Sequence, residues 1–168
     1  MQVNLLSIIN AEGKELPIDT VLDFSGKNEY GIEFPKPVPV KGVFVNLAGS
    51  IEFCGNVNLT ARFMCDRCGE WFDESLNFDF SEILKKELDK EDEVDENPDI
   101  IFYEGHMVDI SDIIYNNIFI NLPSKHLCSE NCKGLCPHCG KNLNISECSC
   151  ENDTTDPRFY VLDNFFKD

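Results

Sequence analysis

"VFVNLAGSIEFCGNVNLTARF", residues 43–63, carries apolar side chains at alternate positions with few exceptions. A period of two is typical of antiparallel strands that bury one face, because successive side chains of a strand point to opposite sides. The stretch therefore predicts half-buried antiparallel strands, with turns or bulges at residues 48–50 and 54–56. The apolar members lie at odd positions: Val43, Val45, Leu47, Ile51, Phe53, Val57, Leu59, Ala61 and Phe63.

A further strand is expected at residues 71–80, where Leu76, Phe78 and Phe80 alternate with polar side chains. The sequence MCDRCG lies between the two strand patterns and is short enough to be a tight connection. Residues 81–99 then hold nine acids against three lysines, and their second half has almost no large apolar side chain. This composition favours a short helix followed by a solvated acidic loop at about residues 87–99.

A helical pattern replaces the strand pattern after residue 105. In VDISDIIYNNIFINLP, isoleucines recur at helical spacing, Asp109 is placed to cap the first turn, and Pro123 ends the element. The many β-branched side chains leave a strand open for part of this stretch. A second short helix, docking on the sheet, is expected at residues 156–168, with Asp156 as N-cap and Pro157 at the first helical position.

Charge and hydropathy argue against several classes of protein. The chain has 168 residues, with 14 Lys and Arg against 31 Asp and Glu, and a formal net charge of −17. Such a charge repels phosphate backbones, so broad nucleic-acid binding by this chain alone is not expected. The N-terminus has no basic leader, and no window approaches the roughly twenty apolar residues of a membrane span. We therefore expect a cytoplasmic protein with reduced thiols and no membrane contact.

The cysteines, nine in number, are grouped at metal-ligand spacing. In CPHCG, two thiolates two residues apart can bind one ion, while Pro137 stiffens the loop and Gly140 permits a left-handed turn. CSC supplies the return pair after the hairpin sequence GKNLNISE. The first predicted site, for a structural zinc ion, consists of Cys136, Cys139, Cys148 and Cys150.

Two further cysteine pairs, in CDRC and CSENC, can complete a second site that joins the sheet to the chain after Pro123. This site consists of Cys65, Cys68, Cys128 and Cys132. A single zinc ion held by a different group stays open: Cys128, Cys132, Cys136 and Cys139. Cys54 lies alone in a strand and is interpreted as a plain small residue. His126 and His138 adjoin the ligands but are less favoured, because enough thiols are present.

Catalysis is not favoured by these patterns. A redox CxxC motif needs a lowered thiol pKa, commonly at a helix N-terminus, whereas CDRC is expected to join two strands. The chain has three histidines, none beside a serine nucleophile pattern, and no Gly-rich phosphate loop. We therefore predict a protein that is not an enzyme and that holds one or two structural zinc ions. A thiol oxidoreductase is the less favoured alternative.

The ordered motifs resemble those of a known family, the bacterial large ribosomal RNA subunit accumulation proteins, or YceD family. The resemblance rests on CDRC after the strands, the acidic segment, VDISDIIYNNIFINLP, LCSENCKGLCPHCGKNLN and the terminal DPRFYVL, and it covers most of residues 38–165. It implies a non-catalytic cytoplasmic factor in ribosome biogenesis, needed for normal accumulation of 23S ribosomal RNA. The step implied is large-subunit synthesis, processing or assembly.

The resemblance also implies partners, with the pre-ribosomal large subunit as the setting. Set beside the net charge of −17, it favours a basic ribosomal protein or an assembly factor as the direct partner. Direct RNA contact is expected to be limited to a small patch: Arg62, Arg67, or the lysines Lys125, Lys133 and Lys141. A general zinc-ribbon adaptor in another complex is the alternative function.

We therefore predict an α+β fold. It consists of an antiparallel β-sheet with one or two packing helices and a zinc-ribbon-like, cysteine-rich C-terminal extension. The expected division is a core at residues 1–123, the extension at 124–155 and the terminal helix at 156–168.

Overall fold

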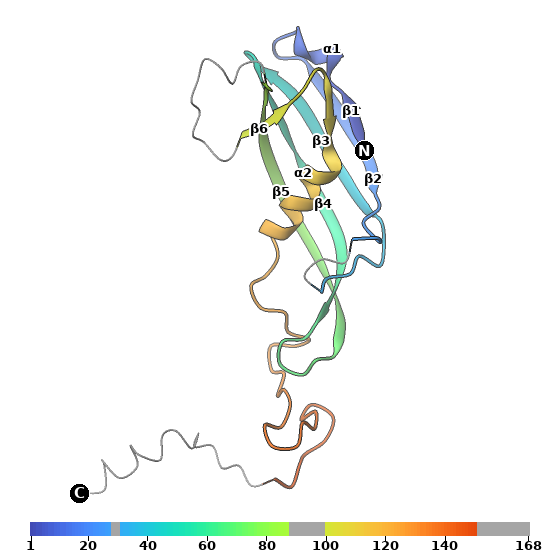
Figure 1. The fold of residues 1–168 in the computed structure, drawn as a ribbon, viewed down its shortest axis with the longest axis vertical. Coiled ribbons are helices and arrows are strands. Elements are labelled where there is room, and N and C mark those ends of the chain that lie inside the picture. Colours follow the sequence, from blue (N-terminus) through green and yellow to red (C-terminus); the bar gives the residue numbers. More distant parts are fainter. Residues whose placement is uncertain (28–30, 88–99, 151–168) are drawn as a thin grey trace, which may run out of the picture.

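The fold is built on one long sheet whose middle strands extend well beyond the rest (Figure 1). The structure is a computed structural model that describes residues 1–27, 31–87 and 100–150. Five strands form the sheet in the order β2-β3-β4-β5-β6. Their bounds are Glu15–Leu22, Val38–Leu47, Ser50–Met64, Trp71–Lys86 and Ile100–Tyr103. The pairs from β2 to β5 are antiparallel, as predicted, but β5 and β6 run parallel.

A small second sheet and two helices complete the described fold. Strands β1 (Gln2–Asn4) and β7 (Met107–Asp109) pair antiparallel. Helix α1 spans Leu6–Ile9, and helix α2 spans Ile110–Ile120. The predicted α+β class is confirmed as mostly β-sheet with two helices. Within the described residues, no helix is long and apolar enough to cross a membrane.

The hairpin of β3 and β4 corrects the predicted choice of buried face. Leu47 pairs with Ser50 across a two-residue turn, in which Ala48 and Gly49 have φ of 50° and 103°. A two-residue turn pairs each even position of β3 with an odd position of β4, so Phe44 lies beside Phe53. Phe44 is fully buried and Leu47 is 51% exposed. The odd positions are therefore buried in β4 and turned to the other face in β3.

The turn expected at residues 54–56 is also wrong, because β4 runs straight through it. Gly55 lies opposite Gly42 in β3. A Cβ on Gly55 would come within 2.2 Å of the Lys41 carbonyl oxygen. Glycine is thus required here by the close approach of two strands rather than by a change of direction.

Strand β5 extends past its predicted end at residue 80. Its register with β4 continues unbroken to Leu84, which pairs with Ile51 and is fully buried. The short helix expected near residues 81–86 is therefore wrong: burial of Leu84 between two strands outweighs the charge pattern. Most of the predicted acidic loop, from residue 88 to 99, lies outside the described residues.

Helix α2 confirms the helical pattern and packs on the sheet. The Asp109 side chain caps it by accepting from the Ser111 N–H at 2.9 Å. Ile114 and Ile118 are fully buried in the core cluster that also contains Phe44 and Phe53. The chain beyond α2 then runs to the far end of the β4–β5 hairpin, where residues 124–150 lie (Figure 1). The helix predicted at residues 156–168 lies outside the described residues.

Candidate metal centre

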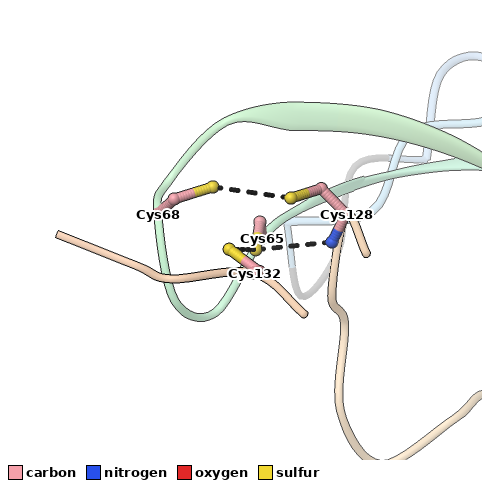
Figure 2. A group of neighbouring side chains, drawn as sticks. All are labelled: Cys65, Cys68, Cys128 and Cys132. Atoms are coloured by element: carbon pink, nitrogen blue, oxygen red, sulfur yellow. Dashed lines mark hydrogen bonds between the residues drawn. The ribbon is translucent and has the colours of Figure 1, made fainter. Parts of the chain in front are cut away.

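The turn between β4 and β5 carries the first pair of cysteines, Cys65 and Cys68. The Cys65 N–H donates to the Glu70 carbonyl oxygen, and the Gly69 N–H donates to the Cys65 carbonyl oxygen, each at 2.9 Å. Gly69 has φ of 71°, a left-handed conformation that glycine adopts without strain. The tight turn therefore aims both sulfur atoms to one side (Figure 2). As predicted, CDRC joins two strands.

Residues 126–132 bring the second pair against this turn. The His126 N–H donates to the Asp66 carboxylate at 2.7 Å, and the Asp66 N–H donates to the His126 carbonyl oxygen at 2.8 Å. The Arg67 guanidinium donates to the Cys132 carbonyl oxygen at 2.9 Å. These contacts hold the chain of Cys128 and Cys132 beside CDRC across 60 to 65 positions of sequence.

The four sulfur atoms of this first cluster (Cys65, Cys68, Cys128 and Cys132) all lie within 4.8 Å of one another. The Cys65 and Cys132 sulfurs are 3.8 Å apart, and those of Cys68 and Cys128 are 3.7 Å apart. In a tetrahedral Zn²⁺ site with Zn–S bonds of about 2.3 Å, neighbouring sulfurs are about 3.8 Å apart. The donor set and its spacing therefore fit a four-thiolate zinc ion.

The second cluster, Cys136, Cys139, Cys148 and Cys150, repeats this geometry with its sulfurs within 4.8 Å of one another. The Cys136 N–H donates to the Lys141 carbonyl oxygen at 2.8 Å, and the Gly140 N–H to the Cys136 carbonyl oxygen at 2.9 Å. This is the hydrogen-bond pattern of the CDRC turn. The first cluster is the more buried of the two: Cys128 is its one exposed thiol, whereas Cys136 is the one buried thiol of the second cluster.

Asn144 connects the two clusters. Its amide group donates to the Cys132 sulfur at 3.2 Å, and its side-chain oxygen accepts from the Lys133 N–H at 2.8 Å. The Leu143 N–H donates to the Gly134 carbonyl oxygen at 2.9 Å in the same strip of chain. A residue in the loop of the second cluster thus holds a sulfur of the first.

The crowding of thiols separates their pKa values. In the first cluster burial raises the pKa of Cys65, but main-chain N–H groups, that of Cys128 foremost, outweigh burial and lower it to about 6. Desolvation, together with the neighbouring thiols, raises the pKa of Cys128 to about 12. In the second cluster the Cys139 N–H and its neighbours lower the pKa of Cys136 to about 6, while contact with Cys139 raises that of Cys150 to about 12.

Zinc uptake near pH 7 is therefore expected to release at least one proton per ion. Cys65 and Cys136 already favour the thiolate at that pH, whereas Cys128 and Cys150 hold their protons until the metal displaces them. Apparent affinity falls as pH falls, more steeply below about 6, where Cys65 and Cys136 also take up protons. Titration of zinc in two buffers of different ionisation enthalpy measures the number released. Uptake without proton release would contradict the expectation.

The structure brings together both predicted groups of four, and it does not gather the alternative group that combined Cys128 and Cys132 with the CPHCG pair. His126 belongs to neither group: its ring stacks on Phe63 with centroids 4.4 Å apart. Cys54 lies within β4, where its sulfur is 3.9 Å from the Val43 carbonyl oxygen. Metal binding itself stays a prediction.

Sequence reasoning missed three residues that build the centre: Asp66, Arg67 and Asn144. The first two lie between the cysteines of CDRC, so their position was a usable signal that they support the site. Asn144 lies in GKNLNISE, where nothing in the sequence separates it from the other polar residues.

Comparison with known proteins now gives the family of this chain. A plant relative from Arabidopsis thaliana, "Large ribosomal RNA subunit accumulation protein YCED homolog 1, chloroplastic", is 27% identical over 154 residues, covering 76% of this chain and 48% of the relative. The homologue of the same name from Zea mays is 29% identical over 148 residues, covering 68% of this chain and 49% of the homologue. This chain thus spans about half the length of these curated relatives. No solved structure matches. The family model "Large ribosomal RNA subunit accumulation protein YceD" matches residues 53–166, and this protein belongs to the YceD family.

Proposed function

We propose that this protein is a non-catalytic accessory factor in ribosome biogenesis, required for accumulation of 23S ribosomal RNA. The observation that carries the proposal is the family match at residues 53–166. The matched region contains most of the β4–β5 hairpin and all eight clustered cysteines. The factor works in the cytoplasm during synthesis, processing or assembly of the large subunit.

Zinc has a structural role in this proposal. Each cluster offers four thiolates to one ion, which leaves no coordination position for a substrate or an activated water. The first cluster joins the hairpin turn to residues 126–132, so its ion fixes the C-terminal extension to the sheet. A closed site of this kind supports a scaffold rather than an enzyme.

The acidity of the chain supports a protein partner over RNA. With a net charge of −17, the protein repels phosphate and attracts basic segments. Proteins that neutralise RNA phosphates are themselves rich in Lys and Arg, so a basic ribosomal protein or assembly factor within the pre-ribosomal large subunit is the partner that fits. Direct contact with RNA is limited. Of the two arginines named for it, Arg62 is paired with Asp73 at 2.7 Å, and Arg67 donates to the Cys132 carbonyl oxygen.

Deletion of the gene in its native host tests the proposal. The ratio of 23S to 16S ribosomal RNA is expected to fall and to recover when the unaltered gene is returned. Cys68→Ser is expected to fail in this rescue, because a buried ligand of the first cluster is lost, and Cys54→Ser is the matched control that succeeds.

Sedimentation of the lysate through a sucrose gradient adds the second readout. Co-migration of the protein with large-subunit precursors is expected. An unchanged ratio of 23S to 16S ribosomal RNA in the deletion strain would contradict the proposal, and partners unrelated to pre-ribosomes would favour a general zinc-ribbon adaptor.

A further inference from the structure

One edge of the long hairpin has no strand beside it in the described part of the chain. Strand β5 runs from Trp71 to Lys86, but β6 pairs with it only from Ile83 to Lys86. Figure 1 shows β6 beside one end of β5, with the rest of β5 extending toward residues 124–150. The edge from residue 71 to residue 82 is therefore open in the structure as described.

The direction of the main-chain groups along this edge follows from Arg62. Its N–H and carbonyl groups both bond to Glu33, on the side of β4 away from β5. Asp73 lies directly opposite Arg62 in β5. Since Arg62 does not bond to β5, the two form a non-hydrogen-bonded pair, and Asp73 turns its own N–H and carbonyl groups outward, away from β4. The register of β4 and β5 has no break, so the same holds at every second position: Asp73, Ser75, Asn77, Asp79 and Ser81.

The two faces beside the open edge differ in chemistry. On the core face, Phe72, Leu76 and Phe78 pack against the core but are only partly buried. On the opposite face, Asp73 and Asp79 are exposed, and the Asp73 carboxylate also accepts from the Arg62 guanidinium at 2.7 Å. A strand added to this edge would cover the partly buried apolar side chains with its inward residues and place its outward residues next to carboxylates.

Charge selects among the strands that can be added. Residues 71–82, WFDESLNFDFSE, contain four acids and no lysine or arginine. A second copy of β5 would bring four more acids and no basic side chain to the edge, which is unfavourable between paired strands. An extended segment that alternates apolar side chains with lysine or arginine satisfies both faces at once.

We propose that the open edge of β5 binds an extended basic segment of a partner protein as an added β-strand. The inference deepens the proposed function, because it states how the protein holds a basic component of the large subunit. Trp71, the single tryptophan of the chain, lies at one end of this edge and is 50% exposed, so its fluorescence reports occupancy.

Amide hydrogen exchange in the full zinc-loaded chain tests the edge directly. In the free protein, the amides of Ser75, Asn77 and Asp79 are expected to exchange faster than those of Leu76 and Phe78, which bond to β4.

The probe is a synthetic peptide of about ten residues that alternates lysine with valine. It is expected to slow the outward amides by at least about tenfold and to change Trp71 fluorescence. A peptide alternating glutamate with valine is expected to do neither.

A proline at the edge supplies the matched variant. Ser75→Pro removes an outward N–H without touching the ladder to β4, so the fold is kept and affinity for the lysine–valine peptide falls about tenfold or more. Ser75→Ala keeps the N–H and is expected to bind as the unaltered protein does. If Ser75→Pro misfolds, Asp79→Lys serves instead, with weaker binding of the basic peptide as the expected result.

Several results would overturn the inference. If the outward amides exchange slowly in the free protein at every protein concentration, the edge is covered by another segment of this chain. If exchange of these amides becomes slower as the protein concentration rises, the edge binds a second copy of this chain. Protection by single-stranded RNA, with none from the peptide, would assign it to RNA.

The cellular readout separates this inference from the proposed function. Ser75→Pro is expected to lower the ratio of 23S to 16S ribosomal RNA where Ser75→Ala does not. A normal ratio with Ser75→Pro, beside a reduced ratio in the deletion strain, would overturn the edge and leave the proposed function standing. A normal ratio in the deletion strain would overturn the proposed function, while peptide binding in vitro would still support the edge.

Discussion

Removal of metal with a chelator is expected to unfold residues 124–150 while the sheet stays folded. In that stretch the buried side chains are those of Cys132 and Cys136, so little apolar packing remains once the ion is gone. Structural zinc in small modules contributes about 10–16 kcal/mol, comparable with the whole stability of a domain. The sheet core, by contrast, contains fully buried Phe44 and Phe53, whose rings stack on each other, and is expected to stay folded without an ion.

Amide exchange measured before and after chelation checks this expectation region by region. Amides of residues 126–144 should lose protection, and those of β3 and the core half of β4 should keep it. Cys68→Ser is expected to lower the protection of residues 126–132, which the first cluster holds, without any chelator present, and Cys54→Ser should leave exchange unchanged. Equal protection of residues 124–150 in the metal-free chain would refute a structural metal.

Phe53→Ala is expected to lower the free energy of unfolding by about 3–5 kcal/mol, as is usual when a buried aromatic ring is truncated. Phe53 stacks on Phe44 with centroids 4.0 Å apart and meets Phe80 edge-on at 4.9 Å. The substitution removes both ring contacts and leaves a cavity between strands β3 and β5. Because domains are stable by only about 5–15 kcal/mol, the variant should be close to unfolding at physiological temperature.

Urea unfolding followed by circular dichroism, at saturating zinc, measures this change. Leu47→Ala is the matched control, since Leu47 lies in the paired strand but is 51% exposed. Its effect is expected to stay within about 0.5 kcal/mol. A loss below about 1 kcal/mol for Phe53→Ala would show that the three rings are not the centre of the core.

The sequence predicted those elements that depend on interactions between residues close together in the chain. The cap of Asp109 and the spacing of Ile114 and Ile118 placed α2, because a helix is specified by residues near one another. The two cysteine groups were also readable, since ligand pairs must lie close in sequence to form a turn.

The misplaced features depend on distant parts of the chain. The buried face of β3 follows from the two-residue length of the turn at Ala48 and Gly49. A turn was expected at residues 48–50, but the odd pattern on both sides of it did not show that the buried positions change from even to odd. The extension of β5 to Lys86 depends on Leu84 lying between β4 and β6, and the parallel direction of β6 is a matter of strand pairing that local patterns do not describe. Likewise Asn144 becomes important only because folding brings it to Cys132.

The contact of Asn144 with Cys132 has a consequence for how the two clusters are filled. The side chain that holds this sulfur belongs to the loop closed by the second cluster, so ordering that loop favours the first cluster. Thermodynamic linkage makes the coupling reciprocal: whatever free energy one occupied cluster contributes to the other is returned in equal amount. We therefore expect the two centres to load zinc as a cooperative pair, so that loss of a ligand in either cluster lowers the metal affinity of both.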